Sequence, residues 1–178
     1  MQPVLSSVLL RGLGALAGDP EIASVVTDSR EAGPGSLFVC IRGERVDGHD
    51  YALRALEAGA AGVVVQRPVP GVPPEKCVQV PDALDAMIRL GANYRALYSP
   101  LLAGVTGSVG KTTTKEFCYA VFSAFGKTLR TQGNQNNEIG MPNTLFRLDK
   151  SVEYAVVEMG MQGLGEIRKL TLAAKPAG

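Results

Sequence analysis

The fold of this 178-residue chain is decided by one stretch, Thr106-Gly107-Ser108-Val109-Gly110-Lys111-Thr112-Thr113-Thr114. A continuous apolar run over 101–106 precedes it, as in a buried parallel strand, and a helical pattern over 111–125 follows it. Because Gly107 and Gly110 can adopt positive φ, the backbone N–H groups between them can turn toward an anion. The positive end of the helix adds to this attraction. The stretch therefore predicts a phosphate-binding loop.

Two side chains of this loop suit nucleotide chemistry. Lys111 can place a positive charge near the β- and γ-phosphates, and Thr112 can offer its hydroxyl to Mg²⁺. The general pattern for such loops, G-x-x-x-x-G-K-[ST], requires glycine where this chain has Val105, and the nearest glycine is Gly104. The loop is therefore a T-G-x-x-G-K-T-T variant of the general form.

A carboxylate is expected beside the loop. Glu158 lies near the end of an apolar run over 152–159, which predicts another buried parallel strand. Open α/β sheets bind their ligands at the carboxyl ends of such strands. We expect Glu158 to hold Mg²⁺ directly or through water, and the alternative is a solvated glutamate at a strand end.

An asparagine-rich segment follows a third predicted strand at 127–131. It runs over 133–142 and reads G-N-Q-N-N-E-I-G-M-P. Asparagine is common in turns, so turn chemistry is one explanation of the segment. Three asparagines within four residues, followed by Pro142 at a helix start, favour contact with a ligand or substrate.

The chain as a whole alternates strands and helices, which predicts an α/β fold with right-handed crossovers in parallel sheets. The other expected strands lie at 22–28, 36–41, 63–65 and 77–80. The other expected helices lie at 51–58, 83–98, 142–148 and 164–174, the first two with the N-caps Asp50 and Asp82. The pattern changes near residue 100. We expect a small domain at 1–81, a connecting helix at 82–100 and the first part of a phosphate-loop domain at 101–178.

Composition narrows the class of protein. Hydrophobic residues make up 46% and charged residues 20%, which excludes disordered, collagen-like and coiled-coil chains. The net charge of +1 gives no case for nucleic acid binding. Nine basic and eleven acidic residues lie in 1–98 against nine and six in 99–178, which favours anion binding in the second part.

The expected free cysteines and the lack of a recognisable targeting signal point to the cytoplasm. The three cysteines are far apart and form no C-x-x-C, so a disulfide framework or a zinc site is not expected, and Cys40 reads as a buried thiol. The apolar start of the chain lacks a basic n-region and is interrupted by Arg11, which excludes a signal peptide. No run approaches the roughly 18 apolar residues of a membrane span.

Six segments carry a resemblance to the Mur ligases, the ATP-dependent enzymes that build the peptide of bacterial cell-wall precursors. The phosphate-loop domain contributes T-G-S-V-G-K-T-T-T-K-E (106–116), G-N-Q-N-N-E-I-G-M-P-N-T-L (133–145) and Y-A-V-V-E-M-G (154–160). The first domain contributes T-D-S-R (27–30), P-G-S-L-F-V (34–39) and G-E-R-V-D-G-H-D-Y (43–51). The resemblance covers nearly the whole chain. The G-N-x-N-N-x-I-G-x-P segment resembles the MurF type, which adds D-alanyl-D-alanine.

The resemblance implies a ligase reaction. ATP with Mg²⁺ phosphorylates the carboxylate of UDP-MurNAc-tripeptide to an acyl phosphate. The amine of D-Ala-D-Ala attacks it, and an amide forms as phosphate leaves. The implied protein is a cytoplasmic monomer that serves peptidoglycan synthesis, cell shape and cell division, with no nucleic acid partner and no membrane span.

The resemblance also implies residue roles. The implied ATP-binding residues are Gly107, Ser108, Val109, Gly110, Lys111, Thr112 and Thr113. Thr112 and Glu158 would serve Mg²⁺, and Lys111, Glu158 and Asn137 would be the catalytic set. The implied substrate-binding residues are Ser29, Arg30, Glu44, Arg45, Asp47, His49, Asn134 and Asn136. The residue types favour a structural hydrogen-bonding role for His49 over general-base catalysis.

The chain departs from the family in two respects. The strand-end glutamate is followed by Gly160-Met161-Gln162-Gly163, where MurF relatives often have G-A-N-H. The family also has a longer central domain and a third domain. We therefore expect an amino-terminal part of such a ligase, without turnover by itself. The alternatives are a MurE-type ligase that adds the third peptide residue, and a nucleotide-sugar or ATP-binding module without catalysis.

Overall fold

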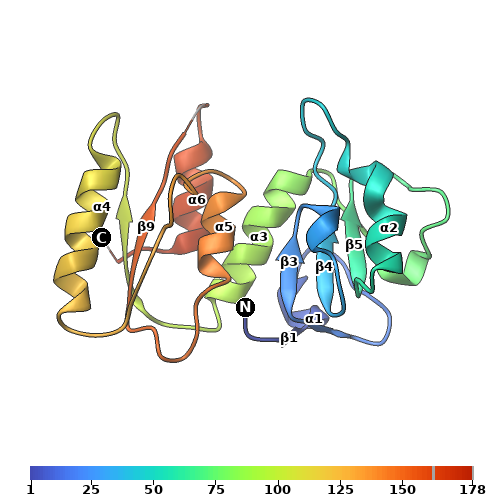
Figure 1. Ribbon diagram of the computed structural model, residues 1–178, viewed down its shortest axis with the longest axis horizontal. Helices are drawn as coiled ribbons and strands as arrows, with labels where there is room; N and C mark the ends of the chain where they lie inside the picture. Colours follow the sequence, from blue (N-terminus) through green and yellow to red (C-terminus); the bar gives the residue numbers. More distant parts are fainter. Residues whose placement is uncertain (162, 178) are drawn as a thin grey trace. The chain divides into compact units, whose positions relative to one another are not determined.

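A computed structural model describes residues 1–161 and 163–177 of the chain (Figure 1). The chain divides into two compact units, Met1–Leu90 and Gly91–Gly178, and the division falls inside helix α3 (Ala83–Arg95). The domain limits expected from the sequence stay a prediction. Within the described residues, no helix is both long enough and apolar enough to cross a membrane.

The first unit is built on a parallel sheet of four strands. Its strands, in spatial order, are β3 (Ser24–Val26), β4 (Ser36–Val39), β5 (Gly62–Val65) and β6 (Cys77–Gln79). All three pairings are parallel. The connections carry a 3₁₀ turn η1 (Ser29–Glu31), the pair η2 (Gly48–Tyr51) and α2 (Ala52–Glu57), and η3 (Pro74–Lys76). The α/β fold class expected from the sequence is confirmed in this unit.

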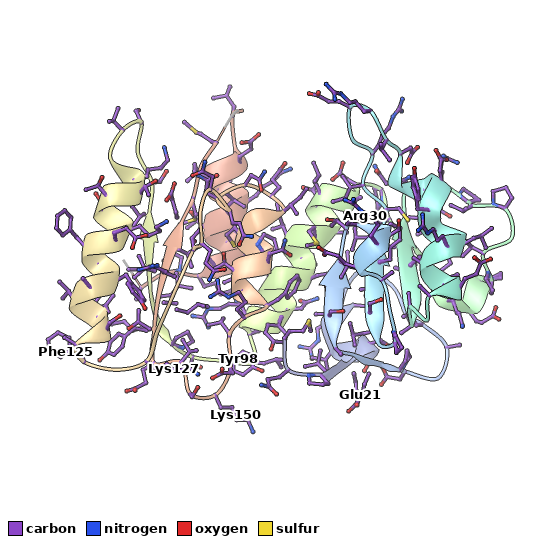
Figure 2. All side chains as sticks on the ribbon, in the orientation of Figure 1. Glu21, Arg30, Tyr98, Phe125, Lys127 and Lys150 are labelled. Carbon is purple, nitrogen blue, oxygen red and sulfur yellow. The ribbon has the colours of Figure 1, made fainter. Side chains whose placement is uncertain are left out.

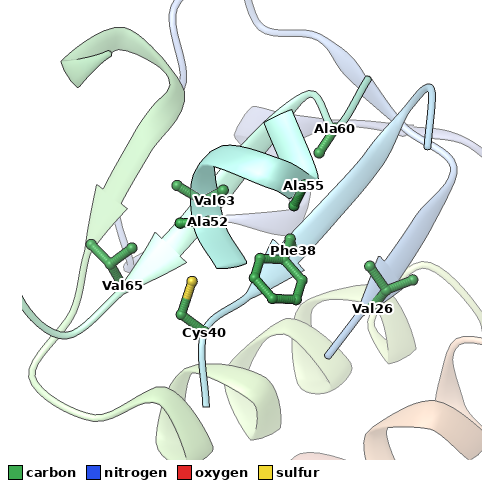
Figure 3. Close-up of a cluster of buried hydrophobic side chains, with 8 residues drawn as sticks. All are labelled: Val26, Phe38, Cys40, Ala52, Ala55, Ala60, Val63 and Val65. Carbon is green, nitrogen blue, oxygen red and sulfur yellow. The ribbon is translucent and has the colours of Figure 1, made fainter. Parts of the chain in front are cut away.

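The core of this unit lies between the sheet and α2 (Figure 3). Its buried members are Val26, Phe38, Cys40, Ala52, Ala55, Ala60, Val63 and Val65. Successive strand residues face opposite sides, and Leu37, Val39 and Val64 are also fully buried, so both faces of β4 and β5 are covered. Burial raises the pKa of the Cys40 thiol to about 12, and the expected buried thiol is confirmed.

The unit differs from expectation at two places. Ile22 does not belong to β3: it lies in β2 (Glu21–Ile22), which pairs antiparallel with β1 (Val4–Leu5), and α1 (Ser6–Leu9) follows β1. Asp50 does not cap the helix at 51–58, so that prediction is wrong. The carboxylate of Asp47 instead accepts the His49 N–H and caps the 3₁₀ turn η2, three residues earlier.

The second unit is a three-stranded parallel sheet in the order β7-β9-β8. Its strands are β7 (Leu101–Val105), β8 (Thr128–Arg130) and β9 (Tyr154–Glu158). Its helices are α4 (Lys111–Ser123), α5 (Gly140–Leu145) and α6 (Glu166–Ala174). Figure 1 shows α4 on one side of β9 and α5 and α6 on the other. The expected alternation of parallel strands and helices is confirmed here.

The strand register shows which edge of this sheet the segments after the strands share. Val105, the last residue of β7, pairs with Glu158, the last residue of β9. Arg130 at the end of β8 pairs with Val156, two residues earlier in β9. The segments after all three strands therefore begin at the same edge.

Phe38 tests the core of the first unit. Its side chain is 1% exposed, so Phe38→Ala should leave a cavity and lower the free energy of unfolding by about 3–5 kcal/mol in a urea titration. Val46→Ala is the matched control, because Val46 is 54% exposed, and it should change the value by less than about 0.5 kcal/mol. Equal effects of the two variants would contradict this account of the core.

Candidate functional site

The phosphate loop joins β7 to α4 and leaves its backbone open. Gly107 has φ +149° and Gly110 has φ +79°, both in the region that favours glycine. A Cβ at Gly110 would meet no atom within 4 Å, so the backbone angle, and not space, requires glycine there. The intervening Ser108 and Val109 are exposed, Val109 by 92%. The loop thus presents N–H groups at the amino end of a 13-residue helix, which suits an anion.

Lys111 and Thr112 begin that helix and face the loop and the strand end. The Lys111 Nζ donates to the Gly107 carbonyl at 2.7 Å, so the ammonium lies folded across the loop. The Thr112 hydroxyl donates to Glu158 Oε2 at 3.2 Å. Thr113 is exposed on the same first turn. The structure therefore brings the expected loop residues together with the expected strand-end carboxylate.

Glu158 is 1% exposed and is held on both carboxylate oxygens. Asn136 Nδ2 donates to Oε1 at 2.9 Å, while Thr112 donates to Oε2. The backbone N–H of Glu158 donates to the hydroxyl of Thr131, which is fully buried just after β8. The residue is thus held from three segments, two of them through its carboxylate, and the alternative of a solvated strand-end glutamate is contradicted.

Sequence reasoning missed Lys115 and Thr131. Lys115 is 1% exposed, and its Nζ lies 3.5 Å from Glu158 Oε2, 3.4 Å from Glu116 Oε1 and 3.5 Å from the Gly133 carbonyl. The signal was present in the sequence, because Lys115 stands one helical turn after Lys111 on the same helix. Thr131 gave no signal of its own.

The asparagine-rich loop supports this edge of the sheet. Asn137 Oδ1 accepts the N–H groups of Ile139 and Gly140, just before and at the start of α5, and Asn136 is the asparagine that reaches Glu158. A Cβ at Gly140 would lie 2.4 Å from the Gln135 Cα, so the loop requires glycine there. Asn134 is exposed. The catalytic role of Asn137 and the substrate roles of Asn134 and Asn136 stay predictions.

The oxygen donors at this edge fit Mg²⁺. Thr112 supplies a hydroxyl and Glu158 a carboxylate, and Mg²⁺ prefers one or two such protein ligands together with substrate phosphates. Residues 1–161 and 163–177 contain no group of three or more His, Cys, Asp or Glu side chains that could hold a metal by themselves. This donor set suits a cation that phosphates help to bind.

In the first unit, Ser29 and Arg30 form the turn η1 after β3. The Arg30 guanidinium bonds both carboxylate oxygens of Asp28, and the Arg30 N–H donates to Asp28 Oδ1. These bonds, the guanidinium first, lower the pKa of Asp28 from 3.8 to about 2. The Arg30 side chain remains 80% exposed.

Asp47 and His49 are committed to internal bonds. His49 Nε2 accepts the Gln66 N–H at 2.8 Å, so the neutral ring carries its proton on Nδ1 and donates it to Asp47 Oδ1 at 2.6 Å. His49 is 3% exposed. The His49 N–H groups, backbone first, hold the pKa of Asp47 well below its usual range, and Arg67 adds an ion pair at 3.2 Å. The favoured structural role of His49 agrees with this geometry.

Glu44 and Arg45 lie on the loop between the bridged residues Arg42 and Asp47. Both side chains are exposed. The substrate-binding roles expected for these two residues, and for Ser29, Arg30, Asp47 and His49, stay predictions.

Comparison with known proteins gives matches in both units. The Mur ligase family catalytic domain matches residues 21–95, and the Mur ligase middle domain matches residues 105–177. UDP-N-acetylmuramoyl-tripeptide–D-alanyl-D-alanine ligase of Synechocystis is 46% identical over 163 residues, which cover 90% of this chain and 36% of that protein. The chain spans only 34–36% of the length of the first curated relatives that it matches.

Two solved structures extend the match to the fold. A crystal structure of MurF from Acinetobacter baumannii has a TM-score of 0.86 and 33% identity, and the match covers 98% of this chain and 39% of that one. The MurF ligase of Thermotoga maritima in complex with ADP has a TM-score of 0.79 and 34% identity, over 86% of this chain and 35% of that one.

The Asp28–Arg30 contact predicts a pH dependence. Because the pKa of Asp28 is lower in the folded state, its ionised carboxylate contributes its full stabilisation above pH 3.8. This contribution is lost as the pH falls toward about 2. Arg30→Met removes the guanidinium but keeps the backbone N–H, so an NMR titration of the Asp28 carboxyl should show its pKa rising part of the way to 3.8. Arg45→Met is the control and should leave the midpoint unchanged. An unchanged midpoint in Arg30→Met would contradict the assignment.

Proposed function

Because the chain belongs to the Mur ligase family, we propose that it serves the ATP-dependent joining of D-alanyl-D-alanine to UDP-MurNAc-tripeptide in peptidoglycan synthesis. The observation that carries the proposal is the contact of Glu158 with Thr112 beside the phosphate loop. Relatives named for this ligation, one of them solved with ADP, support the choice of substrates. The specific match to MurF relatives supports this type over a MurE-type reaction.

The second unit would bind and polarise ATP. The backbone N–H groups of the loop and the Lys111 ammonium would neutralise charge on the β- and γ-phosphates as it moves onto the leaving ADP. Thr112 and Glu158 would hold Mg²⁺, which supplies Lewis-acid stabilisation when bound. The tripeptide carboxylate would then take the γ-phosphoryl group, and the acyl phosphate would accept the D-Ala-D-Ala amine with loss of phosphate.

The first unit would bind the UDP-sugar. Arg30 offers an exposed guanidinium near the end of β3, and the exposed loop with Glu44 and Arg45 follows β4. Both lie after parallel strands, where such sheets bind ligands. The Asp47–His49–Gln66 bonds would shape that loop from beneath, which gives these residues an indirect part in binding. In this proposal the substrate domain is 1–81, the connecting helix 82–100 and the ATP-binding domain 101–178.

The proposed setting is the cytoplasm, where the protein would act as a monomer and contribute to cell shape and division through the cell wall. The free state of Cys40, Cys77 and Cys118 supports a reducing compartment.

Calorimetric titration of the chain with Mg-ATP, and separately with UDP-MurNAc-tripeptide, tests the two binding roles. We expect saturable binding of each ligand at a ratio of one to one. Binding of the sugar nucleotide alone would favour a binding module without catalysis. Binding of nucleotide with no response to the sugar nucleotide would contradict the role of the first unit.

Lys111→Ala tests the phosphate loop. Loss of a charge-assisted contact worth about 2–3 kcal/mol should weaken Mg-ATP binding by about 100-fold. In a chain of the relatives' full length, ligation should fall by about 10³-fold or more. Lys127→Ala is the matched control. Lys127, labelled in Figure 2, lies at the amino end of β8, is 58% exposed and pairs with Asp149. Its loss should leave nucleotide binding unchanged. Near-normal binding by Lys111→Ala would overturn the assignment.

A further inference from the structure

A lysine that the proposed mechanism does not use lies directly behind the metal site. Lys115 projects from the second turn of α4, and its side chain is only 2% exposed. A buried ammonium is costly unless it is paired, and this one lies 3.5 Å from Glu158 Oε2, whose side chain is equally buried. The second carboxylate near it, Glu116, is 45% exposed and also pairs with Arg130 at 2.7 Å. Glu158 is therefore the buried counter-charge of Lys115.

The two oxygens of Glu158 have different surroundings. Oε1 accepts from the neutral amide of Asn136, whereas Oε2 faces both the Thr112 hydroxyl and the Lys115 ammonium. The Glu158–Lys115 pair thus has no net charge at the place where the proposed function puts Mg²⁺. A dication gains little from a carboxylate whose charge an ammonium already balances a few ångströms away.

We propose that Lys115 is a positioning residue that neutralises Glu158, so that the site holds a divalent cation only when nucleotide phosphates supply negative charge. The inference rests on the proposed function, because it concerns the metal of the ATP site. Lys115 touches neither nucleotide nor metal: it acts through the charge and the orientation of Glu158.

Three consequences follow from this arrangement. Without nucleotide, Glu158 stays oriented by Lys115, Thr112 and Asn136. When Mg-ATP enters, the phosphates contribute the negative charge that the neutral pair lacks, so cation and nucleotide enter together. The resting site is also protected from filling with a cation that would have to leave before Mg-ATP could bind.

Binding of Mn²⁺ to the nucleotide-free protein, followed by the electron paramagnetic resonance of free Mn²⁺, tests the proposal. Lys115→Met keeps a side chain of similar length and removes the charge. It should bind Mn²⁺ at least about 10-fold more tightly than the wild type. A purely structural role would lower the stability of this variant without raising its affinity for the cation, so equal affinities would overturn the proposal.

Two further variants separate charge from folding. Lys115→Met combined with Glu158→Gln replaces the ion pair by neutral groups, and it should fold and lose the gained affinity; retention of tight Mn²⁺ binding would overturn the role of Glu158. Glu116→Gln alters the other carboxylate partner of Lys115 and should keep the wild-type affinity within about twofold, since the Lys115–Glu158 pair remains. A gain as large as that of Lys115→Met would contradict the assignment to Glu158.

The stability of the single variant is itself decisive, because it leaves a buried carboxylate without its counter-charge. If Lys115→Met unfolds in metal-free buffer, added Mn²⁺ should restore the fold. Failure of Mn²⁺ to restore it, while the double variant folds, would overturn the proposal. Titration of the wild type with Mg-ATP distinguishes a failure of the proposed function from a failure of this inference. If the wild type does not bind Mg-ATP, the proposed function is rejected. If it binds Mg-ATP but Lys115→Met gains no affinity for Mn²⁺, this inference alone is rejected.

Discussion

The buried carboxylate of Glu158 is the group on which the arrangement of the second unit depends. A carboxylate removed from water must find donors for both oxygens, and here they come from two segments: Thr112 and Lys115 of α4, and Asn136 of the asparagine-rich loop. Its backbone N–H engages Thr131 after β8. Satisfying this one residue therefore draws the ends of all three strands into a common site.

The parallel register makes this convergence possible. Strand β9 lies between β7 and β8, and its last residue, Glu158, pairs with Val105 at the end of β7. The phosphate loop therefore begins one residue after the strand partner of Glu158. The Gly160 N–H donates to the Asn136 carbonyl at 2.7 Å, so the asparagine-rich loop is tied to the segment after β9 by backbone as well as by side chain. A slip of one residue in β9 would turn Glu158 to the opposite face and separate it from Thr112.

The sequence predicted the elements of this site better than their contacts. Periodicity and glycine spacing located the phosphate loop and Glu158, because backbone geometry and apolar runs are local properties. They did not distinguish Asn136 from Asn137, since which amide turns toward Glu158 depends on the path of the loop in space. Asp47 was passed over for Asp50 as a cap because the 3₁₀ turn before α2 moved the start of the helical segment.

Lys115 shows why burial of charge is the hardest property to foresee. The position of Lys115 one helical turn after Lys111 indicates that it lies near the phosphate loop, but a lysine on an amphipathic helix is ordinarily solvated, and its neighbours on the chain do not indicate burial. Its burial follows from the position of α4 against β9, which brings the Nζ to a carboxylate 43 positions later in the sequence. The short distance between Lys115 Nζ and Glu158 Oε2 allows the lysine to be buried and also pairs its charge with that of Glu158. The packing of α4 and the electrostatics of the proposed metal site therefore depend on each other.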